Sequence, residues 1–119
     1  MGMARAVAAG FGAVYLGIGV IGFVFGSPLL GLFDVNELLN LLHVVLGAAL
    51  LYGSTSTVTA ISISRWVGIT LFVVGLLGFV SADGFTVMPL GGNDIWLHLS
   101  TGAILAATGI LEDGDVDAA

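Results

Sequence analysis

The feature that most constrains this chain is a series of long apolar segments with almost no charge. Residues 6–26 contain no charged side chain, and about 20 helical residues cross the roughly 30 Å hydrocarbon core of a bilayer. Three further segments of similar character follow, at residues 37–53, 61–82 and 93–111. This pattern predicts four transmembrane helices, the second of them near the minimum length.

The composition excludes several other classes of protein. Hydrophobic residues make up 58% of the 119 residues and charged residues 8%, whereas a soluble domain carries about 25% charged residues. The chain has no Cys, which excludes disulfides, thiolate nucleophiles and Cys-based metal sites. Its net charge of −6 opposes nucleic-acid binding, which needs Lys and Arg to neutralise phosphates. The partner that the composition predicts is the lipid bilayer.

Polar residues mark where the helices are expected to begin. Asp34 or Asn36 is expected to cap the second helix, and Asn93 or Asp94 the fourth, because such side chains accept hydrogen bonds from the first helical turn. Residues 54–64, rich in Ser and Thr, are expected to connect the second and third helices, with the end of the segment able to wind into the third helix. Residues 1–111 therefore form one four-helix bundle, followed by an acidic tail at residues 112–119 that cannot build a core.

The chain is internally duplicated. An offset of 56 residues superposes Gly12, Gly19 and Gly22 on Gly68, Gly75 and Gly78. An offset of 55 residues superposes Leu42, His43 and Gly47 on Leu97, His98 and Gly102. Each repeat, about 5–53 and 61–110, holds two helices, so both repeats start from the same side of the membrane. The predicted fold is an all-α membrane protein whose four transmembrane helices form two tandem parallel-repeat helical hairpins.

The two basic residues predict the orientation of these hairpins. Arg5 and Arg65 both lie where an odd-numbered helix begins, so they share one side of the membrane. Cytoplasmic loops carry an excess of Lys and Arg. We therefore expect a multi-pass protein of the cell membrane with both termini in the cytoplasm.

The repeated unit combines a glycine-rich helix with a second helix that begins with Asn or Asp and continues as His-x-x-x-Gly. Its residues are Asn36, Asn40, His43 and Gly47 in the first repeat, and Asp94, His98 and Gly102 in the second. This unit resembles the small four-helix membrane proteins called domain of unknown function 4383. The resemblance implies the architecture and no activity. The absence of Lys and the surplus of Asp resemble proteins of halophilic archaea.

Small residues recur every seven positions and predict where the helices pack. The series comprises Gly12, Gly19 and Gly26 in the first helix, Gly47 in the second, Gly68 and Gly75 in the third, and Gly102 and Gly109 in the fourth. In lipid, helices associate largely through close approach of their backbones at small residues. We interpret the stripes as helix-packing positions, the alternative being a glycine-lined conduit.

The paired histidines are the strongest candidate for chemistry. His43 and His98 occupy duplicated positions, with Asn40 and Asp94 one turn or less before them on the same helix faces. Such a pair could bind haem or a metal, or carry protons or a solute. The structural alternative, which we favour from sequence, is that each imidazole forms a hydrogen bond across helices.

No catalytic constellation is present, so we expect neither an enzyme nor a bound cofactor or metal. Tyr15, Tyr52, Trp66 and Trp96 are interpreted as anchors at the membrane interface. The predicted function is structural: packing, assembly, or a role as an accessory subunit of a membrane complex. The predicted partners are further copies of this chain (a homo-oligomer) or the other subunits of a larger membrane complex. The alternative is small-ligand, metal or haem binding, or a proton or solute path, through His43 and His98.

Overall fold

The computed structural model describes residues 2–118, with side chains for residues 2–112. The described part is all-helical and contains no β-strand, as predicted. The elements are α1 (Met3–Phe25), α2 (Glu37–Gly53), α3 (Thr57–Val80), the short 3₁₀ helix η1 (Gly84–Thr86) and α4 (Asn93–Ala118).

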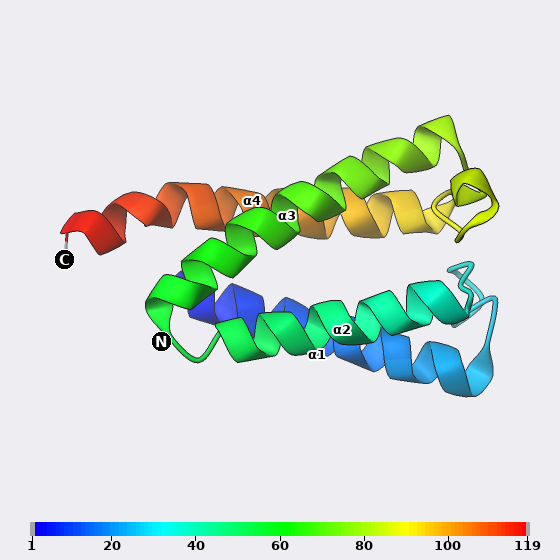
Figure 1. Cartoon of the computed structure of the whole chain (residues 1–119), viewed down its shortest axis with the longest axis horizontal. Helices are drawn as coiled ribbons and strands as arrows, with labels where there is room; N and C mark the ends of the chain where they lie inside the picture. Colours follow the sequence, from blue (N-terminus) through cyan, green and yellow to red (C-terminus); the bar gives the residue numbers. More distant parts are fainter. Residues whose placement is uncertain (1, 119) are drawn as a thin grey trace.

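The helices form two antiparallel hairpins (Figure 1). The most extensive contacts join α1 with α2 and α3 with α4. The start of α1, the α2–α3 connection and the end of α4 lie at one end of the bundle, and the two other connections lie at the opposite end (Figure 1). The Ala4 N–H donates to Glu112 Oε2 over 3.2 Å, which ties the start of α1 to α4.

Three helices are long and apolar enough to cross a membrane, namely α1, α3 and residues 93–112 of α4. Helix α2 is also apolar but has only 17 residues. At 1.5 Å per residue its length is about 25 Å, close to the thickness of the hydrocarbon core.

Side-chain caps explain the helix starts. Asn36 Oδ1 accepts a 2.9 Å hydrogen bond from the Leu39 N–H, so Asn36 caps α2, one of the two residues expected to do so. Ser56 caps α3 in the same way, and α3 therefore begins at Thr57 rather than near Ile61, within the segment expected to be a connection. The backbone of α4 continues to Ala118, into the segment expected to be an acidic tail. The acidic side chains of that segment beyond Glu112 lie outside the side chains that the structure describes.

Glycines bring the two helices of each hairpin into backbone contact. A Cβ atom on Gly12 would lie 3.0 Å from the Gly47 carbonyl oxygen, and one on Gly47 would lie 2.7 Å from the Gly12 carbonyl oxygen. In the second hairpin, a Cβ atom on either Gly68 or Gly102 would lie 2.8 Å from the carbonyl oxygen of the other. Backbone atoms cannot retreat as a flexible side chain can, so only glycine fits at these four positions.

The remaining predicted stripe positions divide into three that pack and one that does not. Cβ atoms on Gly19, Gly75 and Gly109 would all lie 3.0 Å or less from atoms of the partner helix. The packing role predicted for Gly26 is wrong, because nothing lies within 4 Å of a Cβ atom built there. Gly26 instead ends α1 with φ at 72°, a conformation that glycine adopts without steric cost.

We predict that Gly19→Leu destabilises the bundle by about 1–3 kcal/mol or more, the usual cost of overpacking. A Cβ atom at Gly19 would lie 2.8 Å from the Val44 backbone nitrogen. Gly17→Leu is the matched control, since Gly17 lies on the same helix with nothing within 4 Å. Thermal unfolding in detergent should show a lowered midpoint for Gly19→Leu alone; equal midpoints for the two variants would contradict the packing role. Gly75→Leu, in the second hairpin, should behave like Gly19→Leu.

Candidate functional site

Three rings from three helices meet in the middle of the bundle. The centroids of the Tyr15 and His43 rings are 5.4 Å apart, and those of the His43 and His98 rings are 5.9 Å apart. His43 is 3% exposed and His98 1%. The predicted proximity of the two histidines is therefore confirmed, and α1, α2 and α4 each supply one ring.

Tyr15 belongs to this cluster rather than to the membrane interface. Its exposed fraction is 0%, so the interpretation as an interfacial anchor is wrong, whereas Tyr52, Trp66 and Trp96 are exposed. The Thr101 hydroxyl donates to the Leu97 carbonyl, so the Tyr15 hydroxyl donates the 2.6 Å hydrogen bond to Thr101 Oγ1. This bond joins α1 to α4.

A sequence signal for Tyr15 did exist. Tyr15 lies three residues after Gly12 and four before Gly19, which places it on the buried glycine face of α1. Thr101 likewise lies three residues after His98 and next to Gly102. Helical spacing from known packing positions is thus a better guide to the burial of an aromatic residue than its distance from the helix end.

Several polar atoms around the rings are buried without a protein partner. They are both nitrogens of His43, Nδ1 of His98, Oδ1 of Asn40 and both carboxylate oxygens of Asp94. Asp94 is 0% exposed. Burying a polar group without a hydrogen bond costs free energy, and native structures contain few such groups. The cross-helix hydrogen bonds that we favoured from sequence for the two imidazoles are not formed by these atoms.

Asn40 and Asp94 hold different places in the bundle. The Asn40 amide lies against Gly22 of α1, where a Cβ atom would overlap it, so Gly22 provides the space that Asn40 needs. Asp94 lies in the first turn of α4, where a negative charge is favoured by the helix dipole. Among the described side chains, no group of three or more His, Asp or Glu residues is placed to hold a metal ion. The histidines and Asp94 therefore do not form the metal site considered from sequence.

The interior of the bundle is occupied by the rings and by an apolar cluster. The two imidazoles are in edge-to-face contact, with centroids 5.9 Å apart and 60° between their planes. The other half of the bundle contains an apolar cluster that includes Ala8, Leu50 and Leu105, all buried. This cluster fills the interior between the histidines and the end that carries Arg5.

A cavity of about 260 Å³ lies beside the histidines, between α2 and α3. His43 and His98 both line it, and apolar residues form nearly all of the remaining wall. Val45 and Leu42, on its rim, are 56% and 42% exposed. The cavity therefore opens on the outer surface of the bundle.

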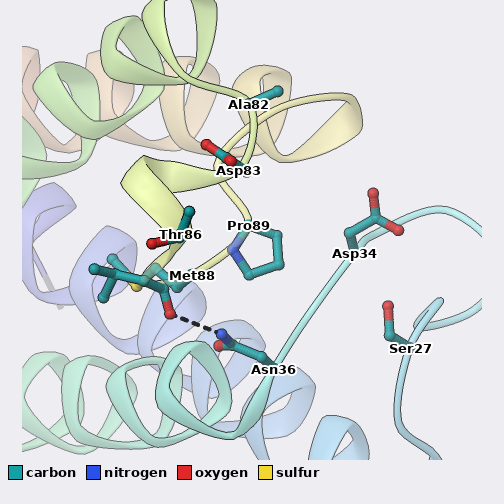
Figure 2. A pocket seen from close by; sticks show the side chains of 9 residues that line it. Ser27, Asp34, Asn36, Ala82, Asp83, Thr86, Met88 and Pro89 are labelled. Atoms are coloured by element: carbon teal, nitrogen blue, oxygen red, sulfur yellow. Dashed lines mark hydrogen bonds between the residues drawn. The ribbon is translucent and has the colours of Figure 1, made fainter.

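A second, more open hollow of about 580 Å³ lies between the connections at the far end of the bundle. Figure 2 shows Asp34 and Asp83, one from each connection, around it. The Asn36 side-chain N–H donates to the Val87 carbonyl over 2.9 Å, which joins the two connections (Figure 2). Met88 lines both this hollow and the cavity, so the two spaces adjoin at that residue.

We predict that Asp94→Asn raises the midpoint of thermal unfolding, by the equivalent of about 1 kcal/mol or more. The substitution keeps the shape and removes the charge of a buried carboxylate whose oxygens have no protein partner. A buried charged group without a partner costs more free energy than a buried neutral amide. Asp83→Asn is the control, since Asp83 is exposed and an amide oxygen there can still accept from the Ser81 hydroxyl, so the midpoint should not change. A midpoint lowered by Asp94→Asn would contradict this account.

The comparisons place the chain in a family. A family model described as domain of unknown function (DUF4383) matches residues 5–111. Comparison with curated proteins and with solved structures gives no match. The match covers all four long helices up to Leu111, and the chain belongs to the DUF4383 family.

Proposed function

We propose that this chain is a multi-pass integral membrane protein in which all four helices cross the bilayer. Large apolar side chains are exposed along every helix, among them Val20, Val45, Phe72 and Ile104, and lipid is the solvent that tolerates such a surface. Helix α2 is short, but it pairs with α1 along its length through Gly47, Asn40 and their partners. Because α2 is packed against α1 in this way, we expect it to cross the bilayer together with α1.

We further propose that the two hairpins are tandem parallel repeats related by a two-fold axis along the membrane normal. The glycine contacts of the two hairpins correspond under the 56- and 55-residue offsets. The connections exchange hydrogen bonds as well: Asn36 donates to the Val87 carbonyl, and Asn93 donates to the Leu32 carbonyl. Leu32 and Val87 are related by the 55-residue offset, whereas the donors Asn36 and Asn93 are 57 residues apart. The two bonds therefore run in reciprocal directions between the connections, as a two-fold axis would place them, with the donors shifted by two residues.

The positive-inside rule then orients the bundle. Arg5 lies in the first turn of α1, and Arg65 is the ninth residue of α3, about 12 Å from its start. Both helices begin at the end of the bundle where α4 ends (Figure 1). The Arg5 Nε–H donates to the Ser54 carbonyl over 2.8 Å, which holds its charge at the carbonyl end of α2. Both termini are therefore assigned to the cytoplasm.

Cysteine labelling tests the topology, because the chain has no Cys of its own. Thr55→Cys, in the exposed α2–α3 connection, should react with a membrane-impermeant maleimide only from the cytoplasmic side. Leu32→Cys, which is 56% exposed in the α1–α2 connection, should react only from the opposite side. Labelling of both positions from one side would show that α2 does not span.

We infer that the function of this protein is to bind a small ligand at His43 and His98, without catalysing a reaction. The observation that carries this inference is the apolar cavity of about 260 Å³ that both histidines line, next to a cluster of buried polar atoms that lack protein partners. An apolar pocket with a few convergent polar groups is the usual form of a small-molecule site.

A role in assembly, as an accessory subunit or homo-oligomer, is the second candidate. The exposed aromatic pair of Phe79 and Trp96, with ring centroids 5.9 Å apart, favours it, because aromatic residues are enriched at interfaces. Such a role leaves the buried histidines unexplained, which is why the binding role is preferred.

Extraction into mild detergent, followed by native mass spectrometry, distinguishes the two roles. We expect a stoichiometric small molecule on the wild-type protein that is lost in both His43→Gln and His98→Gln. Ser64→Ala is the control: Ser64 Oγ is also buried without a partner, but Ser64 does not line the cavity, so the ligand should be retained. A stoichiometric protein partner with no small molecule would favour assembly and contradict the binding role.

A further inference from the structure

We propose that Asp94 and His98 form an internal proton-binding pair, which takes up one proton from water and holds it between a carboxylate oxygen of Asp94 and Nδ1 of His98. This role is separate from ligand binding in the cavity, and it stands or falls without it.

The two residues of the pair lie one helical turn apart on the same face of α4. Residues four apart on a helix have Cβ atoms about 5–6 Å apart, a separation that a carboxylate and an imidazole can bridge. Asp94 is 0% exposed and His98 1%. Within the described part of the chain, both carboxylate oxygens and the imidazole Nδ1 are buried without a hydrogen-bond partner. A side-chain rotation that joins Asp94 to His98 therefore satisfies both groups at once.

Burial determines which protonation state of the pair fits the interior. With an ionised carboxylate and a neutral imidazole, the pair carries one uncompensated negative charge. Such a charge is costly to bury, and its favourable interaction with the dipole of α4 is smaller than that cost. One added proton brings the net charge of the pair to zero, on whichever of the two groups it resides, and completes the hydrogen bond between them. The proton is therefore the ligand that this pair lacks.

The groups around the pair do not supply a counter-charge for the carboxylate. The titratable side chains that face the pair are Tyr15 on α1, His43 on α2 and Asp34 in the α1–α2 connection. The Tyr15 hydroxyl already donates to Thr101, and Asp34 is itself acidic. From α3 the only titratable side chain is Arg65, which lies against Gly109, about four turns along α4 from Asp94. Only His98 shares the helix face of the carboxylate.

The duplication provides an internal control for the pair. The 55-residue offset relates Asp94 to Leu39 and His98 to His43, so the first repeat has the imidazole without the acid one turn before it. Leu39 is 3% exposed and His43 3%, so the two positions are also shielded in the first repeat. If the acid is what makes an imidazole take part in proton binding here, His98 should titrate and His43 should not.

Nuclear magnetic resonance can follow both groups in protein labelled with ¹⁵N at histidine and ¹³C at aspartate, in lipid nanodiscs, between about pH 5 and 8. We expect the Asp94 carboxyl signal to be that of the protonated form at the acidic end, with the His98 Nδ1 signal shifted in step, because a coupled pair titrates as a unit. His43 should shift far less, and the His98 shift should be lost in Asp94→Asn. An Asp94 carboxyl that stays ionised throughout would overturn the proton site. Protonation of Asp94 with no response at His98, or equal shifts of the two histidines, would overturn the pair.

Thermal unfolding in detergent gives a second readout that does not depend on resolving these signals. An Asp carboxyl in water is ionised above about pH 4, so only the folded bundle binds this proton, and folding loses that stabilisation as the pH rises. The gap between the midpoints of Asp94→Asn and the wild type should therefore widen from about pH 5 to 8. The gap for Asp83→Asn, at an exposed position, should stay constant. A constant gap for Asp94→Asn over the same range would contradict proton binding at Asp94.

Discussion

The approach of two backbones at glycine is the interaction on which the rest of this structure depends. At Gly12 with Gly47, and at Gly68 with Gly102, carbonyl oxygens lie where a Cβ atom would be. In the bilayer that we propose as the environment of this bundle, apolar side chains gain little by leaving the solvent, so close van der Waals contact must hold the helices together. Each hairpin is consequently a tight two-helix unit, and the contacts between the hairpins are less extensive.

The difference between the tight contacts within each hairpin and the fewer contacts between the hairpins explains where polar side chains can be buried. Space for Tyr15, His43 and His98 exists only where helices of different hairpins face each other, because the glycine interfaces within a hairpin leave none. The connections then fix the relative position of the hairpins through the Asn36 and Asn93 hydrogen bonds. The cluster of Tyr15, His43 and His98 is therefore a consequence of the less extensive packing between two tightly packed hairpins. The cavity beside the cluster has the same origin.

The features of this structure that follow from the local spacing of residues can be predicted from the sequence. The glycine stripe was predictable because seven-residue spacing defines a helix face, and the proximity of His43 to His98 followed from the duplication. The seven-residue spacing wrongly assigns Gly26 to the packing stripe because the spacing continues to the end of α1. At that position the positive φ of the helix end, rather than packing, requires glycine. Tyr15 was misassigned because its depth was judged from the helix ends rather than from the face that it shares with Gly12 and Gly19.

The cavity could not be predicted, since it depends on how α2 and α3 diverge between the hairpins, which no local pattern encodes. What the duplication does reveal, once the cavity is known, is a difference between its two sides. Tyr15 contacts His43 and is hydrogen-bonded to Thr101, and Asp94 lies four residues before His98 on α4. The residues related to Tyr15, Thr101 and Asp94 by the 56- and 55-residue offsets are Leu71, Leu46 and Leu39, which all line the cavity. The two histidines thus have polar residues on one side and leucines on the other. Leucine on both sides would also fill the space, so packing alone does not account for the polar residues near the imidazoles.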